Sequence, residues 1–157
     1  VRRFNRDLLA VTIEPPGTPT LEVWVVHLKS NSGGREAAEP IRLAEAEAVR
    51  RLLDTRLSAD PDARIAVLGD YNDVWGSRTV ETIAGAGSTA LWSAASSLEG
   101  APPDTSNQGA HQSMIDFILC SPALAQRYVP GSIRIPPGSP ETTGSDHNPV
   151  AASFDLR

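Results

Sequence analysis

The sequence has little of several residue types whose abundance would place it in a special class of protein. Its one cysteine, Cys120, has no partner for an internal disulfide bond, which excludes a disulfide-stapled domain. No apolar run approaches the roughly 20 residues of a membrane-spanning helix, and polar Asn5-Arg6-Asp7 near the start argue against a signal peptide. The chain starts at Val1 rather than Met, which we interpret as a processed or excised piece. These features predict a soluble protein and leave open whether it is secreted or cytoplasmic.

Basic residues are fewer than acidic ones: the sequence has 14 Lys and Arg and 19 Asp and Glu, which gives a formal net charge of −5. A domain that only binds nucleic acid usually carries a basic face, so this balance counts against a pure binding module. The balance is compatible with an enzyme whose carboxylates hold a divalent cation. With 157 residues, of which 40% are hydrophobic, the chain is long enough to bury the core of one domain. We therefore predict a single domain over residues 1–157.

The order of apolar and turn-forming segments predicts a layered α+β sandwich. Strands are expected at residues 8–13, 21–28, 65–68, 114–119 and 150–154. Pro15-Pro16-Gly17 is a turn signal, so the first two strands are expected to form a hairpin. Residues 79–84 are expected to form a short helix, whereas the Ser-, Pro- and Gly-rich segments 96–109 and 136–144 are expected to be loops.

A longer helix is expected after the second strand, with Pro40 in its first turn. Its buried face is predicted to comprise the apolar residues Ile41, Ala44, Ala48 and Leu52, widened by Val49, Leu53 and Leu57. The charged residues of this helix are interpreted as a solvated face, and they are Glu39, Glu45, Glu47, Arg50, Arg51 and Arg56.

Four short segments place ionisable residues at the ends of apolar strands or inside them, where a rigid sheet commonly carries functional groups. They are His27-Leu28-Lys29-Ser30, Gly69-Asp70-Tyr71-Asn72-Asp73, Ile115-Asp116-Phe117-Ile118 and Ser145-Asp146-His147-Asn148-Pro149. Taken singly, His27 is compatible with a structural histidine, and Asp70 or Asp146-His147 with ordinary turns. Asp116 is harder to explain, because an ionised carboxylate inside an apolar strand needs a partner, for which a histidine is suitable.

In this order the four segments resemble the motifs of the endonuclease/exonuclease/phosphatase superfamily. That superfamily includes deoxyribonucleases, abasic-site endonucleases, bacterial secreted nucleases, sphingomyelinases and inositol phosphatases. A single Gly-Asp-x-Asn motif is weakly specific, whereas four motifs in order across most of the chain are strongly so. The resemblance implies the C-terminal portion of a deoxyribonuclease-like four-layer α/β sandwich whose N-terminal strands are missing. Asp73 after the asparagine and the Ala- and Arg-rich helix look closest to the bacterial nucleases.

The resemblance also implies catalytic roles for five residues, His27, Asp70, Asn72, Asp116 and His147. Asp70 would orient or deprotonate the attacking water, and Asn72 would steady that water. Because Asp70 and Asn72 are two residues apart, extended backbone would point both side chains the same way. His147 would lie beside the scissile phosphate while Asp116 holds its other ring nitrogen. His27 would meet the phosphate or the leaving oxygen.

Further residues are implied as contacts of the substrate phosphate and of a metal. Lys29 and Ser145 are the candidates for the phosphate. Asp146, with Asp70 and Asn72, would hold Mg²⁺, or Mn²⁺ in its place. Trp75 and Trp92 suit either base stacking or core packing.

The sequence departs from the superfamily on its N-terminal side, where the resemblance implies a metal-binding glutamate upstream of the histidine segment. Glu14 precedes His27 but stands beside Pro15 and Pro16 in a turn, which makes it a poor ligand. We therefore expect the missing N-terminal half to be a partner of this chain, and the chain alone to be inactive.

The predicted function is metal-dependent hydrolysis of phosphodiesters in DNA or RNA. The alternatives are a phosphatase or phospholipase that acts on inositol phosphates or sphingomyelin, and an inactive piece that serves as a folding or binding module.

Overall fold

The computed structural model describes residues 5–101, 103–108 and 111–157, and among these a five-stranded sheet forms the centre of the molecule. Its strands are, in spatial order, β1 (Leu9–Ile13), β2 (Leu21–His27), β3 (Arg64–Asp70), β7 (Asp116–Cys120) and β4 (Trp92–Ser93). The pair β2–β3 is parallel, and the other neighbours are antiparallel. The predicted hairpin of the first two strands is confirmed. A separate small hairpin pairs β5 (Ser106–Gln108) with β6 (His111–Ser113).

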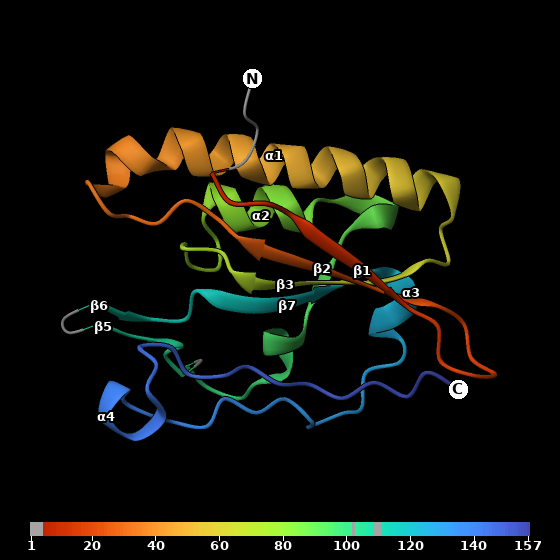
Figure 1. Cartoon of the computed structure of the whole chain (residues 1–157). Coiled ribbons are helices and arrows are strands. Elements are labelled where there is room, and N and C mark those ends of the chain that lie inside the picture. The colour runs from red at the N-terminus through yellow and green to blue at the C-terminus, as the bar shows by residue number, and fades with distance from the viewer. Residues whose placement is uncertain (1–4, 102, 109–110) are drawn as a thin grey trace.

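The two longer helices, α1 (Arg35–Ala59) and α2 (Arg78–Ala84), lie on one face of the sheet, as Figure 1 shows. Helix α1 connects β2 to β3, and α2 follows β3. Short helical turns complete the chain, namely η1 (Gly87–Thr89), η2 (Ala94–Ser97), α3 (Pro122–Ala125) and α4 (Pro140–Thr143). The C-terminal segment runs along the opposite face of the sheet (Figure 1). The layers are therefore helix, mixed sheet and C-terminal segment, which confirms the expected mixed α/β class.

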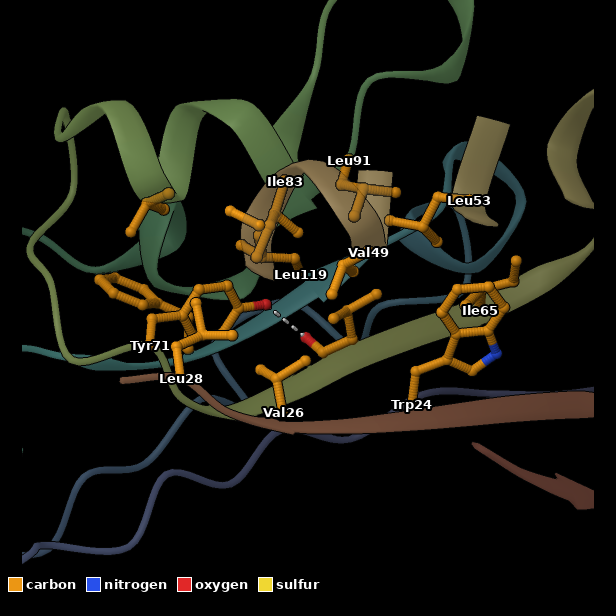
Figure 2. Packing of buried hydrophobic residues seen from close by; sticks show 14 of the residues in the cluster. Trp24, Val26, Leu28, Val49, Leu53, Ile65, Tyr71, Ile83, Leu91 and Leu119 are labelled. Carbon is orange, nitrogen blue, oxygen red and sulfur yellow. Dashed lines mark hydrogen bonds between the residues drawn. The ribbon is translucent and has the colours of Figure 1, made fainter. Parts of the chain in front are cut away.

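The main core lies between the sheet and the two longer helices. Alternation along β2 turns Trp24 and Val26 toward α1, whose buried residues include Val49 and Leu53 (Figure 2). The hydroxyl group of Tyr71 is fully buried in this cluster and donates a hydrogen bond to the backbone oxygen of Val67 at 3.1 Å (Figure 2). A smaller cluster on the opposite face packs against the C-terminal segment. The core thus fixes β2 and β3 from one side.

The prediction for the long helix was wrong in two respects. The helix begins at Arg35, so Pro40 lies beyond its first turn. Its buried face is rotated from the predicted one, because Ile41 and Leu52 are 48% and 47% exposed. The buried residues are Ala38, Arg42, Glu45, Ala46, Ala48, Val49, Leu53 and Leu57. Since two charged residues belong to this face, a hydrophobic pattern alone could not locate it.

The C-terminal predictions also need correction. Residues 150–154 do not form a strand of the sheet. They make only isolated bridges, from Ala151 to Arg134 and from Phe154 to Tyr128, because they lie against an irregular segment. The predicted loop 96–109 contains the end of η2 and the strand β5, while positions 102 and 109 lie outside the described residues.

Candidate active site

Three ionisable residues stand side by side at one end of the sheet. The register of the parallel pair β2–β3 sets His27 opposite Asp70, and that of the antiparallel pair β3–β7 sets Asp70 opposite Asp116. The Nε2 atom of His27 is 3.3 Å from Oδ2 of Asp70. His27 and Asp70 are the last residues of β2 and β3, and Asp116 is the first residue of β7. The pairing of these strands in the sheet therefore brings the three residues together.

Gly69 allows β2 and β3 to approach each other just before Asp70. Its φ is +129°, and a Cβ atom at this position would overlap the backbone oxygen of Val26. Only glycine combines this backbone conformation with so close a neighbour. The glycine of the Gly-Asp-x-Asn motif is therefore part of the geometry that sets His27 beside Asp70.

Asn72 holds the carboxylate of Asp70 through two hydrogen bonds. Its backbone N donates to Oδ1 at 2.7 Å and its Nδ2 donates to Oδ2 at 2.8 Å. The expectation of extended backbone was wrong, since β3 ends at Asp70 and Asn72 has a left-handed φ of 52°. The two side chains nevertheless meet, because this tight turn folds the amide back onto the carboxylate.

The environment of Asp70 raises the pKa of its carboxyl group above its ordinary value. Burial is the largest cause, since the side chain is only 14% exposed, and the negative charge of Asp116 acts in the same direction. The hydrogen bond from the Asn72 backbone and the charges of His27 and His147 oppose this rise without cancelling it. Asp70 is thus a stronger base than an exposed aspartate.

His147 and Asp116 form the pair that the sequence predicted. Nδ1 of His147 lies 2.8 Å from Oδ2 of Asp116, with the two side chains 27% and 18% exposed. Burial alone would lower the pKa of His147, but the hydrogen bond and charge of Asp116 outweigh it and raise the pKa. The charges of Asp70 and Asp146 add to this rise. The imidazole is therefore oriented and biased toward its protonated form.

The loop that carries His147 is held by the residues that lead into β5. The backbone N of Asn148 donates to the oxygen of Thr105 at 2.8 Å, and its Nδ2 donates to the oxygen of Asp104 at 2.9 Å. The hydroxyl of Thr105 accepts hydrogen bonds from the backbone N atoms of Ile115 and Asp116, at 2.9 and 3.0 Å. Thr105 therefore ties the His147 loop to the start of β7.

A buried ionic network supports the other half of the site. The guanidinium of Arg42, fully buried in α1, contacts Asp73 at 3.3 Å and donates to the backbone oxygen of Lys29 and to Oδ1 of Asn31, both at 3.0 Å. Asn31 in turn donates to the backbone oxygen of Asn72 at 3.3 Å. Arg42 thus joins the loop after β2 to the loop after β3.

Sequence reasoning missed this network and placed Glu45 on a solvated face. Glu45 is buried and accepts hydrogen bonds from the backbone N atoms of Asn5 and Lys29, at 2.6 and 2.7 Å. The usable signal was the position of Arg42 and Glu45 on the same helical face as Val49 and Leu53. Charged residues on a buried face require partners, which here are provided by the loops that follow β2 and β3.

The remaining predicted residues lie in different surroundings. The Nζ atom of Lys29 donates to the backbone oxygens of Ser30 and Ser32, at 3.1 and 3.2 Å. Its ammonium group is therefore bound by carbonyl groups of its own loop. Ser145 lines the same cavity as Asp116 and His147. The volume of this cavity is about 490 Å³. Asp146 is exposed on the loop before His147.

The fit to a metal ion is incomplete. Among residues 5–101, 103–108 and 111–157, no group of three or more His, Cys, Asp or Glu side chains is placed to hold a metal ion. Asp70 is engaged with Asn72 and His27, and Asp146 lies on a separate loop. The described residues therefore do not form a metal site by themselves.

The sheet, its helical layer and the paired groups at its end define a mixed α/β fold of the deoxyribonuclease-like class. Residues 2–126 match the family described as Endonuclease/Exonuclease/phosphatase family, and the chain belongs to this family. The match contains the His27, Asp70 and Asp116 segments and ends before His147. Members are generally hydrolases of phosphodiester bonds and commonly use divalent metals.

Solved structures agree on the fold. The truncated TDP2 of Caenorhabditis elegans is similar with a TM-score of 0.66 and 19% identity, over 94% of this chain and 58% of that one. The APE2 catalytic domain of Xenopus laevis gives a TM-score of 0.65 and 18% identity, over 86% and 49%. An endonuclease/exonuclease/phosphatase from Bacteroides vulgatus gives a TM-score of 0.59 and 20% identity, over 88% and 50%.

The chain spans about half the length of these solved structures. No curated protein sequence matches it significantly. None of the helices among the described residues combines the length and apolar character that a membrane span requires.

Proposed function

We propose that the protein hydrolyses phosphodiester bonds, and that its substrate is DNA or RNA. The observation that carries this proposal is the pairing of His147 with Asp116, next to the pairing of His27 with Asp70, at one end of the sheet. His147 and Asp116 line a cavity, and a second imidazole, that of His27, lies beside Asp70. Together these groups offer a phosphodiester both proton acceptors and hydrogen-bond donors.

In this proposal Asp70 positions and deprotonates the attacking water. Its raised pKa makes it a better base, and the two hydrogen bonds from Asn72 fix the direction of its oxygen atoms. A general base is most effective when its pKa is closer to the working pH.

His147 acts on the phosphate itself. Because Asp116 holds Nδ1, Nε2 is the ring atom left to donate to a phosphate oxygen. The raised pKa favours the protonated imidazole, which stabilises the negative charge that develops on the phosphorus oxygens. His27, whose side chain is 49% exposed, is the proposed contact of the phosphate or of the leaving oxygen. Ser145 in the same cavity, and Lys29 on the loop after β2, are the proposed further contacts of the phosphate.

Mg²⁺, or Mn²⁺ in its place, is the cofactor that we propose, with Asp146, Asp70 and Asn72 as its candidate ligands. When bound, such an ion would neutralise the charge on the phosphate oxygens. Mg²⁺ favours carboxylate oxygen ligands in near-ideal octahedral geometry, and the described residues do not complete that set.

The test is nicking of supercoiled plasmid DNA with Mg²⁺ or Mn²⁺, with and without chelator. The protein is assayed alone and fused to its upstream sequence. Chelator-sensitive nicking that disappears in Asp70→Asn and His147→Ala supports the proposal. Hydrolysis of sphingomyelin or an inositol phosphate, without cleavage of DNA or RNA, would instead assign the site to those substrates.

A further inference from the structure

A second cavity lies next to the one that contains His147. Its volume is about 280 Å³, and Phe117 borders both cavities. The cavity is lined mainly by apolar side chains, and two serines, Ser93 and Ser96, also border it. The large apolar residues are Val74, Trp75, Leu98, Met114 and Phe117. The hydroxyl of Ser96 donates to the backbone oxygen of Ser93 at 2.7 Å. Phe117 directly follows Asp116 in β7, so the second cavity is close to the reacting groups without containing any of them.

Trp75 gives this cavity an accessible aromatic face. The residue lies in the loop that follows Asp70 and Asn72, and it is 54% exposed. Its ring centroid is 6.0 Å from that of Phe117, with the two planes inclined at 50°. Neighbouring Val74 is also exposed, at 37%. A large exposed apolar group on the rim of a cavity is typical of a binding surface.

Ser93 provides an independent sign of a ligand. The residue is 4% exposed, and its hydroxyl has no hydrogen-bond partner among the residues that the structure describes. A buried hydroxyl without a partner destabilises the folded protein. A ligand with a polar atom at its edge would satisfy this hydroxyl.

The lining also limits the chemistry of the ligand. No charged side chain borders the cavity among the described residues, so a phosphate or another anion has no counter-charge there. The walls suit a flat, uncharged ring that stacks on an aromatic side chain and carries polar atoms at its edge. An alkyl chain would fill the apolar walls but would leave the hydroxyl of Ser93 unpaired.

We propose that this cavity binds a nucleobase of the substrate strand, next to the phosphate that is cleaved beside His147. The proposal rests on the proposed nuclease function and narrows it, because a substrate with a base is favoured over an inositol phosphate or a lipid. Stacking on Trp75 supplies the affinity, and a hydrogen bond to Ser93 orients the base.

The experiment compares two labelled oligomers of equal length and charge, one of deoxyadenylate and one of abasic sites. Binding is measured by fluorescence anisotropy in chelator, so that no cleavage occurs. We expect the base-bearing oligomer to bind more tightly, and Trp75→Leu to weaken its binding by roughly 5- to 100-fold, to the level of the abasic oligomer. Trp75→Phe should retain part of the preference. Trp92→Phe is the matched control, because Trp92 packs against Tyr128 and does not line the cavity.

Ser93→Ala gives a second readout that does not depend on Trp75. Removal of the unpaired hydroxyl should raise the free energy of unfolding of the free protein, yet weaken binding of the base-bearing oligomer. Loss of binding together with loss of stability would contradict the proposed hydrogen bond.

Equal binding of the two oligomers by the wild-type protein would overturn the base site. If plasmid cleavage were retained, the hydrolase function would stand without it. A base preference in a protein that cleaves no phosphodiester would support the site and contradict the proposed function. Competition by an uncharged detergent with a dodecyl chain would assign the cavity to an acyl chain and overturn the proposal.

Discussion

Nδ1 of His147 lies 2.8 Å from Oδ2 of Asp116, although the two residues come from an irregular C-terminal loop and the first position of a central strand. This contact leads to the first prediction. In the protein with its upstream sequence, His147→Ala should lower the turnover number by about 100-fold or more, because the mutation removes a general acid–base group. The measurement is the initial rate of plasmid nicking, with circular dichroism as the control for folding. Wild-type turnover in the variant would contradict the assigned role.

The raised pKa of His147 leads to a prediction about pH. Titration followed by the imidazole NMR signals should give a pKa above the ordinary value of about 6.5, and Asp116→Asn should lower it. A histidine whose pKa is raised by folding stabilises the protein fully below about pH 6.5 and less as pH rises through the folded-state pKa. The difference in unfolding free energy between the wild type and Asp116→Asn should therefore shrink over that interval. An unchanged difference would argue against the ionic character of the pair.

Arg42 should be among the least replaceable residues outside the reacting groups. Arg42→Leu removes a fully buried partner of Asp73 and should cost about 3–5 kcal/mol of unfolding free energy. Arg51→Leu is the control, since the side chain of Arg51 is 59% exposed and makes only a surface contact with Glu47. That variant should change stability by less than about 1 kcal/mol. Urea denaturation of both variants decides between a structural network and an incidental contact.

Gly69→Ala tests the close approach of β2 and β3. The new methyl group would overlap the backbone oxygen of Val26, and the backbone has a φ of +129°. We expect a loss of at least about 2 kcal/mol, together with loss of activity because His27 and Asp70 move apart. Gly17→Ala, in a turn with a φ of +73° and open space around it, should cost only about 1 kcal/mol. Thermal unfolding of the two variants, side by side, provides the comparison.

The incomplete metal site leads to a fifth prediction. Residues 1–157 alone should bind Mg²⁺ weakly and show no measurable nuclease activity, because too few carboxylates meet in the described site. Activity should appear when an upstream segment supplies a glutamate. Calorimetric titration with Mg²⁺ and the plasmid assay test both statements. Robust chelator-sensitive cleavage by residues 1–157 would show that Asp70, Asn72 and Asp146 form a complete site.

The sequence was sufficient to predict the strands that carry the site and the contact between Asp116 and His147. Asp116 stands in an apolar strand, so its need for a histidine could be inferred from the cost of burying a charge. The position of Asn72 could not be inferred in the same way, because its left-handed turn has no signal in a period-two pattern. Arg42 was overlooked and Glu45 was assigned to the solvated face, because hydrophobic periodicity treats every charge as solvent-exposed. A strand was predicted at residues 150–154 because their apolar side chains pack against the smaller core cluster, although these residues form only isolated bridges.

The alignment of His27, Asp70 and Asp116 across three strands has a consequence for folding kinetics. The parallel pair β2–β3 can form only after the chain has closed a loop that contains the whole of α1, and such long-range closures are slow. The contact of His147 with Asp116 also needs the C-terminal segment to pack against the sheet. We therefore expect the reacting groups to come together late in folding, so that partly folded chains would lack the paired histidines.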